Sequence, residues 1–186
     1  GQMFPGFLTP DIHVDNRALN GRSTRSFRNE GHWELVRKKL RKGDYVFIQF
    51  GHNDQKADTA RHSDAETDYK INLGKYIDET RKVGAIPVLF TPIVRRKFNP
   101  NGTLADTHGK YTDAVRTVAK EKQVLLIDLN KMSAGLLEKY GPEKSTSLFV
   151  WVEPGIYAAL PKGKQDNTHL NVRGARLIAR MVAEAI

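Results

Sequence analysis

Tyr45-Val46-Phe47-Ile48-Gln49-Phe50 is the stretch that decides the fold, and Gly51-His52-Asn53-Asp54 follows it directly. The first six residues are nearly all apolar, a pattern typical of a strand that is covered on both faces of a parallel sheet. The next four are polar or glycine, and they stand at the carboxyl end of that strand. Because ligands of open α/β sheets bind beyond this end of the strands, the stretch predicts a buried strand that leads into a candidate site.

Strands and helices are predicted to alternate on both sides of this stretch. Residues 86–90 and 124–127 are apolar runs that predict two more strands, and residues 12–16 predict a shorter one. Such alternation indicates a doubly wound parallel sheet with helices between the strands. Apolar residues recur at helical spacing in four segments, marked by Trp33, Val36 and Leu40, by Tyr69, Leu73, Tyr76 and Ile77, by Tyr111, Ala114, Val115 and Val118, and by Val172, Ala175, Ile178 and Val182.

Two helix starts are marked by capping residues. Ser63-Asp64-Ala65-Glu66 has the form of a capping box, in which the serine accepts from the third amide and the glutamate reaches back. Asn171 is a suitable N-cap for the last helix. We therefore expect one long helix after Ser63 and another that closes the chain after Asn171.

Length and composition limit the classes of protein. The 186 residues suit one domain, residues 1–186, and the absence of cysteine excludes disulfides and thiolate zinc sites. No run of about 18 apolar residues predicts a membrane span, and the first residues lack a signal-peptide pattern. The net charge of +9 indicates either attraction to a polyanion or a solvated basic surface. Because the basic residues are scattered, we favour the solvated surface and expect neither nucleic acid nor a membrane as a partner.

Three polar clusters stand where ligands of such a sheet bind. Asn53 could offer an uncharged N–H group to an oxyanion, or its segment could be an ordinary turn. Asp166-Asn167-Thr168-His169 could bring a carboxylate onto an imidazole and leave the other ring nitrogen free as a general base, or it could be a turn before a helix. Gly21 could expose its backbone N–H to a bound group, or it could be a turn glycine.

Taken together, the three clusters resemble the SGNH/GDSL hydrolases, and in particular their rhamnogalacturonan acetylesterase-like branch. That branch has an Asn-x-Ala-x-x-Gly-Arg-Ser segment, then Gly-His-Asn-Asp, then a late Asp-x-x-His, which correspond here to residues 16–23, 51–54 and 166–169. The resemblance extends over nearly the whole chain. It implies a three-layer α/β/α fold with a flavodoxin-like parallel sheet.

The resemblance also implies roles for particular residues. His169 would be the general base and Asp166 the carboxylate that orients it. The backbone N–H of Gly21 and the side-chain amide of Asn53 would be two oxyanion-hole donors. Candidate substrate-binding residues next to these donors are Arg22 and His52.

One element of the family pattern is absent from the sequence. The Gly-Asp-Ser segment, whose serine is the family's nucleophile, occurs nowhere, and the family places it before the point at which this chain begins. None of the six serines stands in that context. We therefore expect a chain truncated at its N-terminus that lacks the first strand of the sheet, and we expect little or no esterase activity from it.

Three other functions compete with this interpretation. A metallophosphoesterase would use Asp11-Ile12-His13 with Gly51-His52-Asn53-Asp54, but the middle letters of the second block are reversed and no Gly-His-x-His follows, so we reject it. A non-catalytic polyanion-binding domain would need aromatic residues interleaved with a basic stripe, and none is evident. A lipase, lysophospholipase or thioesterase of the same family would need a long apolar groove. Residues 133–160, including Trp151 and Tyr157, could instead line a sugar-binding cleft or simply pack.

We therefore expect a serine esterase that removes acetyl groups from a plant cell-wall polysaccharide, with rhamnogalacturonan favoured and xylan possible. Its partner would be the acetylated polysaccharide, and the chemistry needs neither a cofactor nor a metal. Such an enzyme is expected to be secreted or periplasmic.

Overall fold

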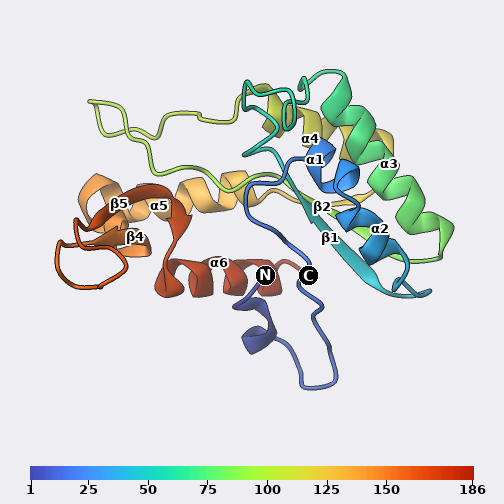
Figure 1. Ribbon diagram of the computed structural model, residues 1–186, viewed down its shortest axis with the longest axis horizontal. Helices are drawn as coiled ribbons and strands as arrows, with labels where there is room; N and C mark the ends of the chain where they lie inside the picture. Colours follow the sequence, from blue (N-terminus) through green and yellow to red (C-terminus); the bar gives the residue numbers. More distant parts are fainter. The chain divides into compact units, whose positions relative to one another are not determined.

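The computed structural model describes all residues from 1 to 186, and the chain forms two compact units (Figure 1). The unit that we call the sheet unit contains Arg17–Pro92 and His108–Asn130. The unit that we call the hairpin unit contains Gly1–Asn16, Ile93–Thr107 and Lys131–Ile186. Both units are discontinuous, because the chain passes repeatedly from one to the other.

A parallel sheet of three strands is the centre of the sheet unit. The strands are β1 (Tyr45–Gln49), β2 (Ile86–Phe90) and β3 (Leu125–Ile127), in the order β1-β2-β3. β1 and β2 pair in register along their whole length, from Tyr45 opposite Ile86 to Gln49 opposite Phe90. The three apolar runs predicted as strands are therefore confirmed, within a residue at each end.

Helices cover one face of this sheet. α3 (Asp68–Lys82) and α4 (Lys110–Glu121) both pack against β2, and α3 runs along the sheet in Figure 1. α1 (Thr24–Asn29) and α2 (His32–Arg37) precede β1, and α1 packs against α3. The core between sheet and helices is formed by apolar side chains, among them Val46, Ile48, Leu89, Tyr76, Ile77 and Val115.

The other face of the sheet is partly exposed, which differs from the sequence expectation. Tyr45 is 61% exposed, Ile86 40% and Leu125 50%, whereas Val46 and Ile48 on the opposite side of β1 are buried. Alternate residues of a strand point to opposite faces, so β1 is buried on one face only. The prediction of a strand covered on both faces is wrong for β1.

Two local predictions in the first third of the chain are wrong. Residues 12–16 form no strand, because no other strand pairs with them and a strand requires that pairing. The helix expected to start at Ser63 begins at Asp68 instead. The Asp64 carboxylate accepts hydrogen bonds from the amides of Glu66 and Thr67, and it holds these residues in a turn before the helix.

The hairpin unit is built from a two-stranded antiparallel sheet and helices. β4 (Phe149–Val152) pairs with β5 (Lys164–Leu170), and the chain then enters α6 (Val172–Glu184). Asn171 caps α6 as predicted, since its side chain accepts from the Gly174 amide at 3.0 Å. The remaining elements are the 3₁₀ turns Phe4–Phe7 and Ser145–Leu148 and helix α5 (Leu129–Lys144), whose first two residues belong to the sheet unit. None of the helices in the chain is long and apolar enough to cross a membrane.

Candidate active site

The Asp166 carboxylate and the His169 imidazole contact each other in the hairpin unit. Asp166 Oδ2 lies 2.8 Å from His169 Nδ1, which is the contact that their spacing made possible. With the carboxylate ionised, Nδ1–H donates this bond, and the lone pair of the ring is then on Nε2. The His169 side chain is 65% exposed, so Nε2 is open to a substrate. The pair has the arrangement needed for a general base and the carboxylate that orients it.

The pair lies on a strand, which the sequence did not predict. Asp166 and His169 both belong to β5, at the end of which the chain turns into α6. The other Asp166 oxygen, Oδ1, accepts from the amides of Thr168 at 2.8 Å and His169 at 2.9 Å. The carboxylate therefore fixes the backbone around His169 as well as its ring.

A lysine completes the shell of donors around this carboxylate. Lys164 Nζ lies 3.1 Å from Asp166 Oδ2, the same oxygen that contacts His169. Burial on its own raises the pKa of Asp166. The hydrogen bonds from the His169 and Thr168 amides, from the imidazole and from Lys164 outweigh burial and hold this pKa well below its ordinary value. Asp166 is therefore ionised throughout the range in which an esterase works.

Asn167, one of the two residues between Asp166 and His169, is held through both its main chain and its side chain. The Asn167 carbonyl accepts from the Arg96 amide, and Asn167 Oδ1 accepts from Arg96 Nη1, both at 2.8 Å. The indole N–H of Trp151 donates to the same Oδ1 at 3.0 Å. The Arg96 guanidinium also lies over the Trp151 ring, 4.8 Å from its centroid. Arg96 and Trp151 thus fix the part of β5 that carries the pair.

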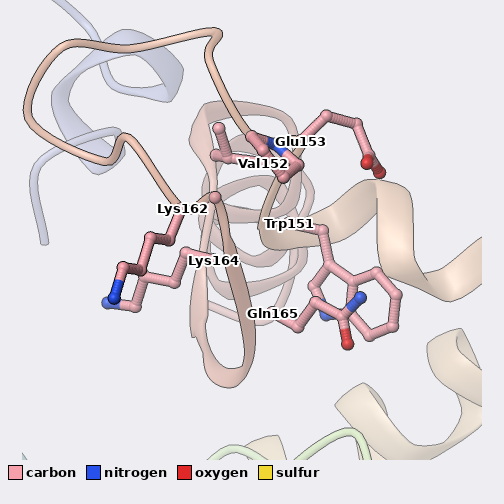
Figure 2. A pocket seen from close by; sticks show the side chains of 8 residues that line it. Trp151, Val152, Glu153, Lys162, Lys164 and Gln165 are labelled. Carbon is pink, nitrogen blue, oxygen red and sulfur yellow. The ribbon is translucent and has the colours of Figure 1, made fainter.

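A cavity of about 360 Å³ in the hairpin unit is lined by residues of β4, β5 and the loop between them, but by neither Asp166 nor His169. Figure 2 shows that Lys162 and Lys164 extend to one side of the hairpin, whereas Trp151 and Gln165 extend to the other. Lys164, which contacts Asp166, is part of the cavity wall. The cavity is open, and its wall includes two ammonium groups, an indole, an amide and the Glu153 carboxylate.

The two candidate oxyanion donors lie in the sheet unit, on two loops that contact each other. Gly21 has a φ of 77°, in the left-handed region, and its N–H has no acceptor within the chain. Asn53 Nδ2 donates one hydrogen bond to the carbonyl of Arg22 at 3.2 Å, so its second N–H remains available. The structure therefore brings the side-chain amide of Asn53 next to the residue that follows Gly21.

Asp54 connects these two loops, a role that was not predicted from the sequence. Its carboxylate is fully buried and accepts from the Thr24 amide at 2.9 Å, from the Thr24 hydroxyl at 2.5 Å and from the Gly51 amide at 3.0 Å. Burial raises the pKa of Asp54, and these hydrogen bonds oppose that rise in part. Thr24 starts α1 just after Gly21, and Gly51 follows β1. Asp54 therefore fixes the loop of Gly21 against the loop of Asn53.

The two candidate substrate-binding residues have intramolecular partners. Arg22 forms an exposed ion pair with Glu30, at 2.7 Å between Nη2 and Oε2, and donates from Nη1 to the Asn20 carbonyl. The His52 ring lies edge-on against the His108 ring, with centroids 4.5 Å apart. Both residues stay candidates for substrate contact. Arg22 would have to exchange an intramolecular partner for a ligand.

None of the six serines is both exposed and without a hydrogen bond inside the chain. Five of them are buried, and the sixth, Ser147, donates its hydroxyl to the Lys144 carbonyl at 2.7 Å. The buried serines serve the fold. Ser23 and Ser26 form the capping box of α1, Ser133 accepts from the Val94 amide and Ser145 accepts from Arg96. Nor does any group of three or more His, Asp or Glu side chains have the arrangement of a metal site.

Around the Asp166–His169 pair, sequence reasoning missed Lys164 and Arg96. Lys164 stands two residues before Asp166, and residues two apart on a strand lie on the same face. That relation would have identified Lys164 if residues 164–170 had been recognised as a strand. Arg96 is 70 residues away from Asp166 along the chain, and no local pattern relates the two.

Comparison with known proteins gives the family. Residues 3–177 match the GDSL-like lipase/acylhydrolase family, and the chain belongs to it. By family the protein is thus a carboxylic ester hydrolase. The expected resemblance to rhamnogalacturonan acetylesterases is also confirmed. The chain is 41% identical over 186 residues to rhamnogalacturonan acetylesterase RhgT of Bacillus subtilis (strain 168), across 100% of this chain and 79% of that protein.

A second relative and a solved structure agree with the family assignment. The probable rhamnogalacturonan acetylesterase YesY of Bacillus subtilis (strain 168) is 34% identical over 187 residues, which cover 100% of this chain and 82% of YesY. The crystal structure of the Bacillus subtilis protein YxiM matches with a TM-score of 0.82 at 28% identity. The match covers 99% of this chain and 48% of that one, so the chain spans about half the length of YxiM. This structural match confirms the three-layer α/β/α class expected from the sequence, of which the sheet unit itself contains the sheet and one layer of helices.

Proposed function

We propose that this protein is an acetylesterase that removes acetyl groups from a plant cell-wall polysaccharide, with rhamnogalacturonan as the favoured substrate and xylan as the second. The observation that carries the proposal is the 2.8 Å contact between Asp166 Oδ2 and His169 Nδ1, which leaves Nε2 open. The names of two relatives, both rhamnogalacturonan acetylesterases, support the choice of substrate. Such a substrate is extracellular, so we also propose that the protein is secreted or periplasmic.

In the proposed reaction, His169 Nε2 takes the proton of a serine hydroxyl as the serine oxygen attacks the acetyl carbonyl. Asp166 keeps the proton on Nδ1 and stabilises the imidazolium that forms. The backbone N–H of Gly21 and the free N–H of Asn53 donate to the oxyanion of the tetrahedral intermediate. The intermediate then collapses: the bond between the acetyl carbon and the sugar oxygen breaks, the imidazolium gives its proton to that oxygen, and the acetyl group stays on the serine as an ester. In the second half, His169 activates a water that releases acetate.

The serine itself is proposed to lie outside these 186 residues, in a segment that precedes them and supplies another strand. The burial of five of the six serines, together with the engagement of Ser147 in a hydrogen bond, supports this. We accordingly propose that residues 1–186 are most of one hydrolase domain.

The test is hydrolysis of 4-nitrophenyl acetate by two forms of the protein. The 186-residue chain is expected to show little turnover, and a chain extended by the residues encoded upstream is expected to be active. In the extended chain, His169→Ala should lower kcat by about 10³-fold or more, and Asn53→Ala by about 10²- to 10³-fold. Acetate release from acetylated rhamnogalacturonan and from acetylated xylan then ranks the substrates.

Two outcomes would contradict the proposal. If the 186-residue chain is fast and His169→Ala abolishes its activity, one of the six internal serines is the nucleophile. If the extended chain is folded and inactive on both polysaccharides and on 4-nitrophenyl acetate, the acetylesterase assignment is wrong.

A further inference from the structure

Lys164 and the candidate general base, His169, both contact the same oxygen atom of Asp166. Asp166 Oδ2 lies 3.1 Å from Lys164 Nζ and 2.8 Å from His169 Nδ1. The ammonium and the imidazole are therefore at most about 6 Å apart, by addition of these two distances. The Asp166 side chain is only 11% exposed, so water competes weakly for this oxygen. A carboxylate that serves only to orient a histidine needs no such cation.

We propose that Lys164 is a positioning residue of the pair, whose ammonium group takes up part of the Asp166 charge and so weakens the hold of this carboxylate on a protonated His169. This inference rests on the proposed function, because the proposed function makes His169 the general base. The arrangement of charge itself is independent of any activity.

The consequence for His169 follows from electrostatics. An ionised carboxylate next to an imidazole stabilises the protonated ring, and a nearby ammonium group destabilises it. A general base works only in its unprotonated form, so a proton held too tightly removes the base from the reaction. Lys164 is thus expected to oppose the stabilisation that Asp166 gives to a protonated ring, while Asp166 still fixes the orientation of that ring.

The other charged groups around β5 do not contact Asp166. On the loop that joins β4 to β5, Glu153 and Lys162 line the cavity. Arg96 binds Asn167, on the side of β5 that faces Trp151. On α6, Arg173 lies over the ring of Tyr140, and Arg176 and Arg180 lie over Phe7. Lys164 is the one cation bound to the carboxylate.

The experiment is a pH titration of His169 by NMR in the 186-residue chain, with ¹⁵N-labelled histidine and His169→Gln to assign its signals. Lys164→Gln should move the midpoint of the His169 titration upward by about half a pH unit, the effect of a unit charge about 6 Å away in a largely aqueous setting. Lys164→Arg keeps the charge and should restore a midpoint near that of the unchanged protein. The matched control is Lys162→Gln, which removes the neighbouring lysine and should move the midpoint little.

Each outcome decides the proposal. An upward shift in Lys164→Gln that is absent from Lys164→Arg and Lys162→Gln supports it, whereas an unchanged or lowered midpoint in Lys164→Gln overturns it. Equal shifts in the two glutamine variants also overturn it, because they show a general effect of surface charge. Thermal unfolding of each variant shows whether the hairpin stays folded, and if Lys164→Gln unfolds, Lys164→Met is titrated in its place. The titration needs neither substrate nor serine, so its result stands apart from that of the esterase assay.

Discussion

Asp54 shows how one buried side chain holds a candidate site together. Its two oxygens accept three hydrogen bonds from Thr24 and Gly51, at 2.5 to 3.0 Å, and these join the loop of Gly21 to the loop of Asn53. A buried donor that loses its acceptor costs about 1–3 kcal/mol. The residue therefore stabilises the fold and also fixes the two loops that carry the candidate oxyanion donors.

Asp54→Asn should lower the free energy of unfolding by about 1–3 kcal/mol, because the amide nitrogen that replaces one oxygen cannot accept from Thr24 or Gly51. The measurement is urea denaturation followed by circular dichroism. An exposed carboxylate near the same loop, Asp58, offers the control variant Asp58→Asn, which should change stability far less. Equal stability of the unchanged protein and Asp54→Asn would contradict the role given to Asp54.

The effect of Asp54→Asn on stability should also depend on pH. Burial raises the pKa of the Asp54 carboxyl group in the folded chain above its value in the unfolded chain. The folded chain therefore binds a proton at Asp54 more tightly than the unfolded chain does. The stability that comes from that proton is complete below the unfolded pKa, about 4, and is lost as the pH rises through the folded pKa. The stability difference between the unchanged protein and Asp54→Asn should therefore be larger at pH 4 than at pH 7. A difference that grows towards neutral pH would mean that Asp54 folds as a carboxylate with a lowered pKa.

At the scale of elements, the start of α6 depends on close backbone packing. Asn171 accepts from the Gly174 amide and also donates to the carbonyls of Ser147 and Phe149, both at 2.9 Å. These bonds hold the first turn of α6 against the start of β4 and the turn before it. A Cβ atom added to Gly174 would lie 2.1 Å from the carbonyl oxygen of Leu148, which is closer than atoms can approach.

Gly174→Ala and Gly135→Ala should therefore have opposite effects, although both glycines are inside helices. Gly135→Ala in α5 has open space around the new methyl group and should stabilise the protein by about 0.5–1 kcal/mol, the usual helix-propensity gain. Gly174→Ala should destabilise it by about 2 kcal/mol, because backbone must shift to admit the methyl group. Thermal unfolding of the two variants compares them. If Gly174→Ala is as stable as Gly135→Ala, α6 does not pack as closely as described.

At the scale of the whole molecule, the sheet presents an open edge and an exposed apolar face. β1 pairs with β2 alone, and Tyr45, Ile86 and Leu125 are all at least 40% exposed on that face. Sheet edges with exposed apolar side chains associate with other chains, and a charge placed on the edge opposes this.

The 186-residue chain should consequently associate as its concentration rises, and Tyr45→Lys should reduce that association. Sedimentation velocity over a range of concentrations measures it. Tyr157 is similarly exposed, at 59%, and lies outside the sheet, so Tyr157→Lys adds the same charge elsewhere and is the control. Equal association of the two lysine variants would show that net charge, not the sheet edge, is responsible.

Local sequence patterns predicted the parts of the fold that depend on local physics. The apolar runs of β1, β2 and β3, the helical periodicity of α3, α4 and α6, and the cap at Asn171 are all present. The residues near 12–16 also have a strand-like pattern, yet they form no strand, since pairing depends on a second segment far along the chain. β5 was missed for the converse reason. Its first six residues are polar, and its pairing with β4 makes it a strand.

The sequence by itself determined the family, the parallel α/β class and the identity of the candidate base, carboxylate and oxyanion donors, because these are carried by short motifs and by periodicity. Only the tertiary structure decided what surrounds those residues. The contacts of Lys164 with Asp166, of Arg96 with Asn167 and of Asp54 with Thr24 depend on pairing and packing between segments. No local pattern encodes these contacts, because each forms only when the backbone of one segment presents its side chain to another.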